Sequence, residues 1–185
     1  MSGVLERLLA VAVSQHGFFT VGQAGEVGVG DDQVRRLAVK GVVERRAQGV
    51  YRVSSVPLGP YSEYIEAVLW TRGEGLIAGP SALVLWDLAD VSPRRIHLAV
   101  ETGARFRRGG ADRYELHFES GLARLKDHVF GVGVVSVAAA IRQSIQWGTP
   151  GDLVDQAIGR AVAREHLGSE SKRLLVDQLL ERNRG

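Results

Sequence analysis

The sequence of 185 residues has no cysteine and no continuous apolar run of the length that a membrane-spanning helix requires. Without cysteine the chain cannot form disulfides or thiolate metal sites, and it suits a reducing compartment. A transmembrane helix needs about 18 or more consecutive apolar residues. The N-terminal stretch is amphipathic and contains Glu6 and Arg7, unlike a signal peptide. We therefore expect a folded, cytoplasmic protein that does not associate with a membrane.

Neither sign of charge is in large excess. The 23 basic and 21 acidic residues leave a net charge of +2, so a nucleic-acid site would have to be a local patch. Hydrophobic residues make up 45% of the chain, which is enough for one domain or two small ones with real cores. The glycine pairs at 73 and 75 and at 131 and 133 lack the third glycine and the strand-to-helix position of a dinucleotide loop. We therefore expect no cofactor.

The first thirty residues contain the signals of two helices. Residues 4–15 place three leucines and Ala12 at helical spacing, and Gly17 ends that stretch. Thr20 and Gln23 have the spacing of a capping box, in which each side chain binds the backbone N–H of the other residue. This pattern predicts a second helix from about residue 21 to residue 27.

A third helix is predicted from Gly30, its N-cap, to Lys40. Asp31 and Asp32 in its first turn suit the positive end of the helix dipole. The apolar residues at helical spacing, which should face inward, are Val34, Leu37 and Ala38. The outward side is then polar and mostly cationic, with Gln33, Arg35, Arg36 and Lys40.

A short basic hairpin is predicted after the third helix. Residues 42–46 and 49–53 read as two strands around the turn Ala47-Gln48-Gly49. The polar side chains of the hairpin are Arg45, Arg46, Gln48 and Arg52. Helices followed by a basic hairpin in this order are the layout of a winged helix-turn-helix, which we assign to residues 1–54.

The third helix of such a domain enters the major groove of DNA. Arginine can form two hydrogen bonds with guanine and glutamine can do so with adenine, so Gln33 and Arg36 are the expected base-reading residues. The other polar residues are expected to contact phosphates, which position the protein and make affinity depend on salt; they are Arg35, Lys40, Arg45, Arg46, Gln48 and Arg52. A cationic ridge on an isolated helix would be an ordinary solvated face. The adjoining hairpin favours DNA binding.

The rest of the chain predicts a second, mixed domain over residues 61–185. Two prolines and a glycine without periodicity make residues 55–60 a predicted linker. Residues 95–100 and 113–119 alternate between apolar and polar, so we expect an antiparallel pair around the loop 102–112, and a third strand over 129–135. Helices are predicted from Pro80 and over residues 61–72, 137–147, 153–166 and 170–182. The expected fold class is α+β.

The N-terminal segment also resembles a known family. The residues that carry the resemblance are Phe19-Thr20, Gln23-Ala24, the Gly-Val-Gly turn at 28–30, residues 34–43 and Gly49-Val-Tyr-Arg52. They are similar to the N-terminal domain of AbiEi-type antitoxins, the regulator half of bicistronic toxin-antitoxin systems. The remainder resembles the family's C-terminal region more weakly, through the helix at Ser81-Ala82, the strand 96–100 and the closing helices. The resemblance implies binding to an inverted repeat in double-stranded operator DNA and neutralisation of a nucleotidyltransferase-like toxin protein.

Two other sets of residues have alternative interpretations. The alternating strands carry His97, Glu101, His117 and Glu119, which could form the site of a metal-dependent nuclease. The usual metal-binding motifs are missing, so a polar outer face of the sheet is the better interpretation, and we expect no metal and no enzymatic activity. The basic segment 94–113 contains Arg94, Arg95, Arg105, Arg107, Arg108 and Arg113. It could contact a nucleic acid or an acidic protein, or it could be a solvated loop that protects the sheet edge.

These observations favour an antitoxin that represses its own operon and whose second domain binds the cognate toxin. If a toxin binds the closing helices, part of their apolar surface should remain exposed. An inverted repeat implies two bound copies, so we expect a monomer or weak dimer that pairs on DNA. The alternative is an ordinary winged-helix transcription factor whose C-terminal domain binds an effector or dimerises.

Overall fold

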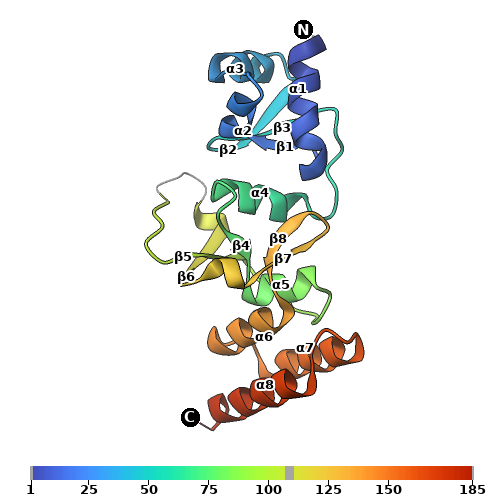
Figure 1. Ribbon diagram of the computed structural model, residues 1–185, viewed down its shortest axis with the longest axis vertical. Coiled ribbons are helices and arrows are strands. Elements are labelled where there is room, and N and C mark those ends of the chain that lie inside the picture. The colour runs from blue at the N-terminus through green and yellow to red at the C-terminus, as the bar shows by residue number, and fades with distance from the viewer. Residues whose placement is uncertain (1, 107–110, 185) are drawn as a thin grey trace. The chain divides into compact units, whose positions relative to one another are not determined.

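The computed structural model describes residues 2–106 and 111–184. These residues form two compact units (Figure 1). The N-terminal unit contains the described residues of Met1–Gly75, Arg105–Ala111 and Phe130–Val132. The C-terminal unit contains those of Leu76–Ala104, Asp112–Val129 and Gly133–Gly185. Helices and strands occur in both units, which confirms the predicted α+β class.

The N-terminal unit has the element order of a winged helix-turn-helix, as predicted. Its elements are α1 (Ser2–Ala12), the 3-10 helix η1 (Val13–Gln15), β1 (Phe18–Thr20), α2 (Val21–Glu26), α3 (Asp31–Val39), β2 (Val43–Ala47), β3 (Val50–Val53) and α4 (Ser62–Trp70). The strands lie in the order β1-β3-β2, and β3 is antiparallel to both neighbours. Strands β2 and β3 form the hairpin that follows α3.

Strand β1 is absent from the sequence-based prediction. It pairs with β3, and Phe19 lies opposite Tyr51 in the register. Phe18 and Phe19 are both fully buried. Three residues are too few for an alternating pattern to reveal a strand. Because β1 pairs with β3, it attaches the hairpin to the helices.

The three helices and the hairpin share one core. It consists of Leu8, Ala12, Phe19, Ala24, Val29, Val34, Val43, Tyr51 and Val53. The predicted capping box is present at the start of α2, where the Thr20 hydroxyl accepts a hydrogen bond from the Gln23 backbone N–H at 3.2 Å. The Gln23 side-chain oxygen accepts from the Thr20 backbone N–H at 2.9 Å. The shared core and this cap hold α3 and the hairpin in a fixed relation.

Helix α4 belongs to the N-terminal unit, so the compact units differ from the boundary predicted at residues 55–60. Glu66 on α4 is 2% exposed. Its carboxylate lies 3.1 Å from the Arg46 guanidinium on β2. Ile65 and Ala67 are buried as well. The prolines mark a connection inside the unit, because the side chains of α4 pack against the sheet.

From residue 76 the elements are β4 (Leu76–Ile77), α5 (Gly79–Leu85), β5 (Ile96–Glu101), η2 (Ala111–Arg113), β6 (Tyr114–Glu119), η3 (Leu122–Arg124), β7 (Lys126–Val129), β8 (Val132–Val135), α6 (Val137–Gln146), α7 (Gly151–Ala163) and α8 (Ser169–Arg182). The strands lie in the order β6-β5-β4-β8-β7. Helices α6, α7 and α8 pack against one another (Figure 1). The predicted helices are confirmed, and Gly168 is the N-cap of α8. Among the described residues, no helix combines the length and apolar character needed to span a membrane.

The expected antiparallel pairing of the segments 95–100 and 113–119 is wrong. Strands β5 and β6 are parallel, with Ile96 opposite Tyr114 and Glu101 opposite Glu119. An alternating pattern reveals the two faces of a strand but not its direction. The length of the connection is the signal for the parallel arrangement, since hairpin loops have about two to five residues and crossovers a dozen or more.

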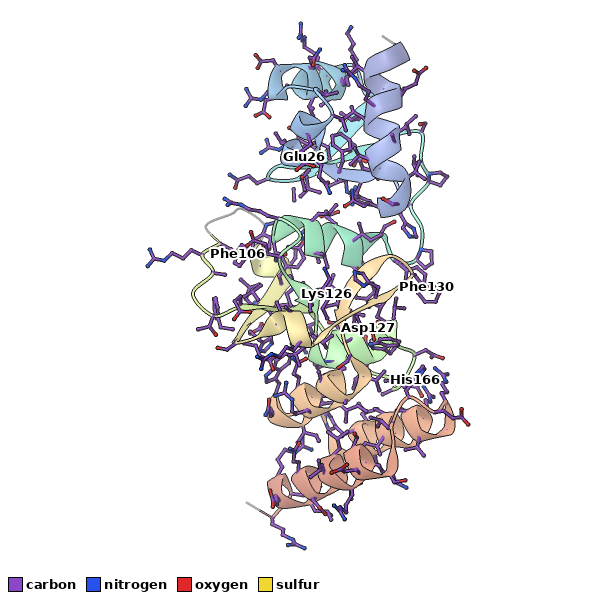
Figure 2. The ribbon with its side chains drawn as sticks, viewed as in Figure 1. Glu26, Phe106, Lys126, Asp127, Phe130 and His166 are labelled. Atoms are coloured by element: carbon purple, nitrogen blue, oxygen red, sulfur yellow. The ribbon has the colours of Figure 1, made fainter. Side chains whose placement is uncertain are left out.

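The segment 129–135, expected as one strand, contains a turn. Strand β7 ends at Val129 and β8 begins at Val132. Between them Phe130 and Gly131 have φ angles of 51° and 80°, as two-residue hairpin turns require. Phenylalanine rarely adopts a positive φ, so its presence hides the turn from sequence analysis. Phe130, labelled in Figure 2, stacks on Tyr61 with ring centroids 4.2 Å apart.

Candidate nucleic-acid interface

Helix α3 is held with its polar side outward. The Gln33 side-chain oxygen accepts a hydrogen bond from the Gly30 backbone N–H at 3.1 Å and so caps the start of the helix. Val34 is fully buried, and Leu37 and Ala38 pack against the same core. The exposed residues of this helix and its C-cap are Asp31, Asp32, Arg35, Arg36, Val39 and Lys40.

An open groove of about 630 Å³ lies between α3 and the hairpin. It is lined by Val21, Asp31, Arg35, Ala38, Val39, Arg45, Gln48, Gly49 and Tyr51. Arg35 on the helix and Arg45 on the hairpin thus border one cavity. Basic side chains on a helix and on an adjoining hairpin form the electrostatic footprint of a duplex-binding site. The groove defines the candidate interface.

Arg35 is paired with two carboxylates but remains accessible. Its guanidinium nitrogens lie 3.6 Å from an Asp31 oxygen and 3.8 Å from an Asp32 oxygen, and its side chain is 68% exposed. Exposed ion pairs of this kind contribute about 0–1 kcal/mol. A phosphate can therefore replace either carboxylate at little cost. The side chains of both aspartates thus face Arg35.

The remaining polar side chains of the candidate interface are exposed to different degrees. Arg36 is exposed and its Nε donates to the Asp32 backbone oxygen at 3.2 Å. Lys40 at the end of α3 and Gln48 in the hairpin turn are exposed. Gln33 is half-buried because its side chain forms the cap. The structure therefore brings Arg35, Arg45 and Gln48 together around the groove and leaves Gln33, Arg36 and Lys40 outside its lining.

Arg46 and Arg52 lie elsewhere than expected, in ion pairs inside the N-terminal unit. Arg52 is 9% exposed, lies 2.9 Å from a Glu44 carboxylate oxygen and donates to the Val56 backbone oxygen. Arg46 lies 2.8 Å from Glu44 and 3.1 Å from Glu66. Hydrogen bonds donated by Arg52 and then by Arg46 lower the pKa of Glu44, and the hydrogen bonds that Arg46 donates to Glu44 and then to Glu66 raise the pKa of Arg46. These two arginines stabilise the fold and do not present their charge at the groove.

Part of this arrangement has a signal in the sequence. Glu44 lies opposite Arg52 in the register of the hairpin and two residues before Arg46. A carboxylate opposite an arginine on paired strands indicates an ion pair. The second partner, Glu66, comes from α4, and no local pattern predicts that contact. Val39, which lines the groove, can also be noticed in the sequence, because it is an apolar residue on the otherwise polar side of the third helix.

The two histidines considered for a nuclease lie together in the C-terminal unit. His97 Nδ1 and His117 Nε2 are 3.0 Å apart. The Trp147 indole stacks on both rings, with its centroid 3.4 Å from that of His117 and 5.9 Å from that of His97. Burial, followed by the neighbouring His97, lowers the pKa of His117 to about 4, and burial also lowers the pKa of His97. Both rings are therefore neutral near pH 7 and share a hydrogen bond.

The carboxylates considered with these histidines have other partners. The Glu119 oxygens accept hydrogen bonds from Arg142 and Gln143. The Glu101 oxygens accept from the backbone N–H groups of Gly121 and Leu122, each at 3.0 Å. In the described part of the chain, no three residues of the metal-binding types are arranged to hold an ion. These hydrogen bonds of the two carboxylates are thus made with groups other than the two histidines.

The described arginines of the basic segment 94–113 are divided between the two units. Arg95 pairs with Glu115 at 3.2 Å, and the Arg113 guanidinium lies 5.3 Å from the Tyr114 ring centroid. Arg94 is exposed in the C-terminal unit, whereas Arg105 belongs to the N-terminal unit. Arg107 and Arg108 lie outside the described residues.

The comparisons with known proteins agree with this geometry. Residues 6–54 match the model of a family described as "Transcriptional regulator, AbiEi antitoxin". The match confirms the resemblance predicted for the N-terminal segment and indicates a DNA-binding regulator of the antitoxin type. No curated protein matches the chain significantly.

A solved structure has a similar fold. It is the crystal structure of the RV2827C protein from Mycobacterium tuberculosis, with a TM-score of 0.58 and 17% sequence identity. The similarity covers 97% of this chain and 74% of that one. At this identity the likeness concerns the fold alone, and it extends over both units.

Proposed function

We propose that this chain is the antitoxin of a toxin-antitoxin pair, a cytoplasmic autorepressor that binds an inverted repeat in double-stranded operator DNA. The observation that carries the proposal is the groove of about 630 Å³ with Arg35 on one side and Arg45 and Gln48 on the other. The family match over residues 6–54 supports it. This is a binding function, so we assign no catalytic residue and no cofactor.

The proposed contacts follow from the exposure of the side chains. Arg36 is the proposed base-reading residue, because it is exposed on the outward side of α3 and can bind guanine through two hydrogen bonds. Arg35, Lys40, Arg45 and Gln48 are proposed to contact phosphates. Gln33 keeps its oxygen in the helix cap, which leaves the NH₂ group as a hydrogen-bond donor to DNA. We exclude Arg46 and Arg52 from the proposed interface because both form ion pairs inside the N-terminal unit.

Binding to the DNA upstream of the chain's own operon tests this part of the proposal. We expect Arg35→Ala and Arg45→Ala each to weaken binding to all duplexes and to reduce the slope of log affinity against log salt by about 1. Arg173→Ala removes an exposed arginine from α8 in the C-terminal unit and should change neither quantity. Two copies should bind each inverted repeat. If all three variants bind like the wild type, the groove is not the DNA-binding site.

We further propose that the C-terminal unit neutralises a nucleotidyltransferase-like toxin by direct binding. The support is a groove of about 270 Å³ lined by Leu125, Ser136, Ala138, Ala139, Arg142, Ser171, Leu174, Leu175 and Gln178. Leu174 at this groove is 54% exposed. Apolar surface therefore remains on α8 for a partner protein.

Co-purification of the full chain with the protein encoded by the adjacent gene tests the second part. We expect Leu174→Glu to abolish co-purification, because a charge would then have to be buried in the contact. Leu180→Glu, which lies on α8 outside the groove lining, should retain the partner. An adjacent gene of ordinary metabolism, whose product does not bind the chain, would instead favour a winged-helix transcription factor with a C-terminal effector or dimerisation domain.

A further inference from the structure

We infer that Val39 contacts the 5-methyl group of a thymine in the major groove and thereby contributes to base specificity. The inference rests on the proposed DNA binding and adds a specificity-determining residue to it. Val39 is 89% exposed, the highest value among the large hydrophobic side chains in the described part of the chain. A side chain so exposed buries almost no apolar area in the fold, so folding does not explain a valine at this position.

Val39 is the last residue of α3 and lies on the outward side of the helix. It follows Arg36 by three residues and Arg35 by four, and residues at these spacings are neighbours on a helix surface. It also lines the groove that α3 shares with the hairpin. On the opposite side of the helix Val34 is fully buried. An apolar side chain therefore stands beside two cationic ones on the side of the helix proposed to face DNA.

The chemistry of the major groove gives this side chain one matching group. Base edges in that groove present hydrogen-bond donors and acceptors, and thymine alone adds a methyl group. The valine side chain cannot form hydrogen bonds, so its favourable interaction in the groove is apolar contact with that methyl group. Burial of one methyl group corresponds to about a fourfold change in affinity.

The surrounding charges favour a duplex over a protein as the occupant of this surface. Arg35, Arg36 and Lys40 on α3 and at its end, together with Arg45 at the groove, outnumber the two exposed carboxylates of α3, Asp31 and Asp32. A second copy of the chain that packed this face against itself would bring like charges together. A duplex brings phosphates instead, which the cations attract.

Replacement of thymine by uracil tests the inference, because uracil lacks only the 5-methyl group. The wild-type full chain selects its preferred duplex from a randomised library, and each thymine of that duplex is then replaced singly. We expect one thymine per bound copy at which uracil weakens wild-type binding by about fourfold. Val39→Ala should bind the unmodified duplex about fourfold more weakly and show no further loss with uracil. Val39→Thr, which keeps one methyl group, should restore part of the uracil effect.

Val13→Ala is the matched control, since Val13 is also a valine of the N-terminal unit, 73% exposed, and lies outside the groove lining. It should keep both wild-type affinity and the full uracil effect. The inference is overturned if no uracil weakens binding, or if the effect persists undiminished in Val39→Ala. In either case the proposed DNA binding would still stand if the wild-type chain binds its duplex tightly and Arg35→Ala weakens that binding. A wild-type chain that selects no duplex would overturn both.

Discussion

Two consecutive arginines of the hairpin, Arg45 and Arg46, have different surroundings. Arg45 is exposed at the groove beside α3. Arg46 lies between Glu44 and Glu66. The register of the hairpin shifts between Arg45 and Ala47, so Arg46 occupies an irregular position at which a strand can redirect a side chain. A basic stretch of sequence therefore offers its charges to a partner only where the fold leaves them without buried carboxylates.

The largest effect expected from this comparison is on stability. Arg46→Met should lower the free energy of unfolding by about 2–4 kcal/mol, because Glu66 is buried and would lose its cation. Arg45→Met should change it by less than about 0.5 kcal/mol, as expected for an exposed side chain. Urea denaturation of the two variants measures both values.

Affinity for DNA should decrease in the Arg45 variant and not in the Arg46 variant, the reverse of the effect on stability. Under conditions in which both variants are folded, Arg45→Met should bind the duplex more weakly and Arg46→Met should bind like the wild type. The distinction between the two arginines would fail if Arg46→Met were as stable as the wild type and had lost affinity as Arg45→Met does.

The second effect is on the pH dependence of stability and compares the exposed Arg45 with a half-buried histidine of the C-terminal unit, His117. Because the pKa of His117 is about 4 in the folded chain, below the ordinary value of 6.5, the unfolded chain binds more protons between these values. Stability should therefore decrease as pH falls from about 6.5 to 4, by about 1–3 kcal/mol. Denaturant titrations at several pH values measure the loss.

His117→Phe provides the control for the pH effect. It keeps an aromatic ring against Trp147 and removes the titrating group, so its stability should depend less on pH over the same interval. Equal pH dependence in the variant and the wild type would assign the effect to other groups. Glu115 and Glu119 also face this ring and oppose the effect of burial, so the loss should be smaller than for an isolated buried imidazole.

The smallest expected effect is at the start of α3. Replacement of both Asp31 and Asp32 by Asn should release Arg35 from its ion pairs and raise affinity for all duplexes by about threefold to tenfold at low salt. The gain should shrink as salt is added. Asp177→Asn, an exposed carboxylate on α8, is the control and should leave affinity unchanged. A loss of affinity at one base pair only would instead identify an aspartate as a base-reading residue.

Local signals predicted most of the N-terminal unit. The capping box at Thr20, the glycine before Asp31 and the alternation of the hairpin each depend on neighbouring residues, and the corresponding elements are present. The predictions that failed depended on distant contacts. The parallel pairing of β5 and β6 is invisible to alternation, and the position of α4 depends on the contact of Glu66 with Arg46. Arginines can be located in a sequence, but a partner from a distant element, such as Glu66, is known only from the fold.

The central claim is that α3 enters the major groove of a duplex, and protection of guanine N7 from methylation tests it most directly, since N7 lies in that groove. We predict that the bound wild-type chain protects guanines in each half of its duplex, and that Arg36→Ala loses protection of one guanine per half while Arg46→Met loses none. Binding that leaves every guanine N7 reactive would contradict the claim.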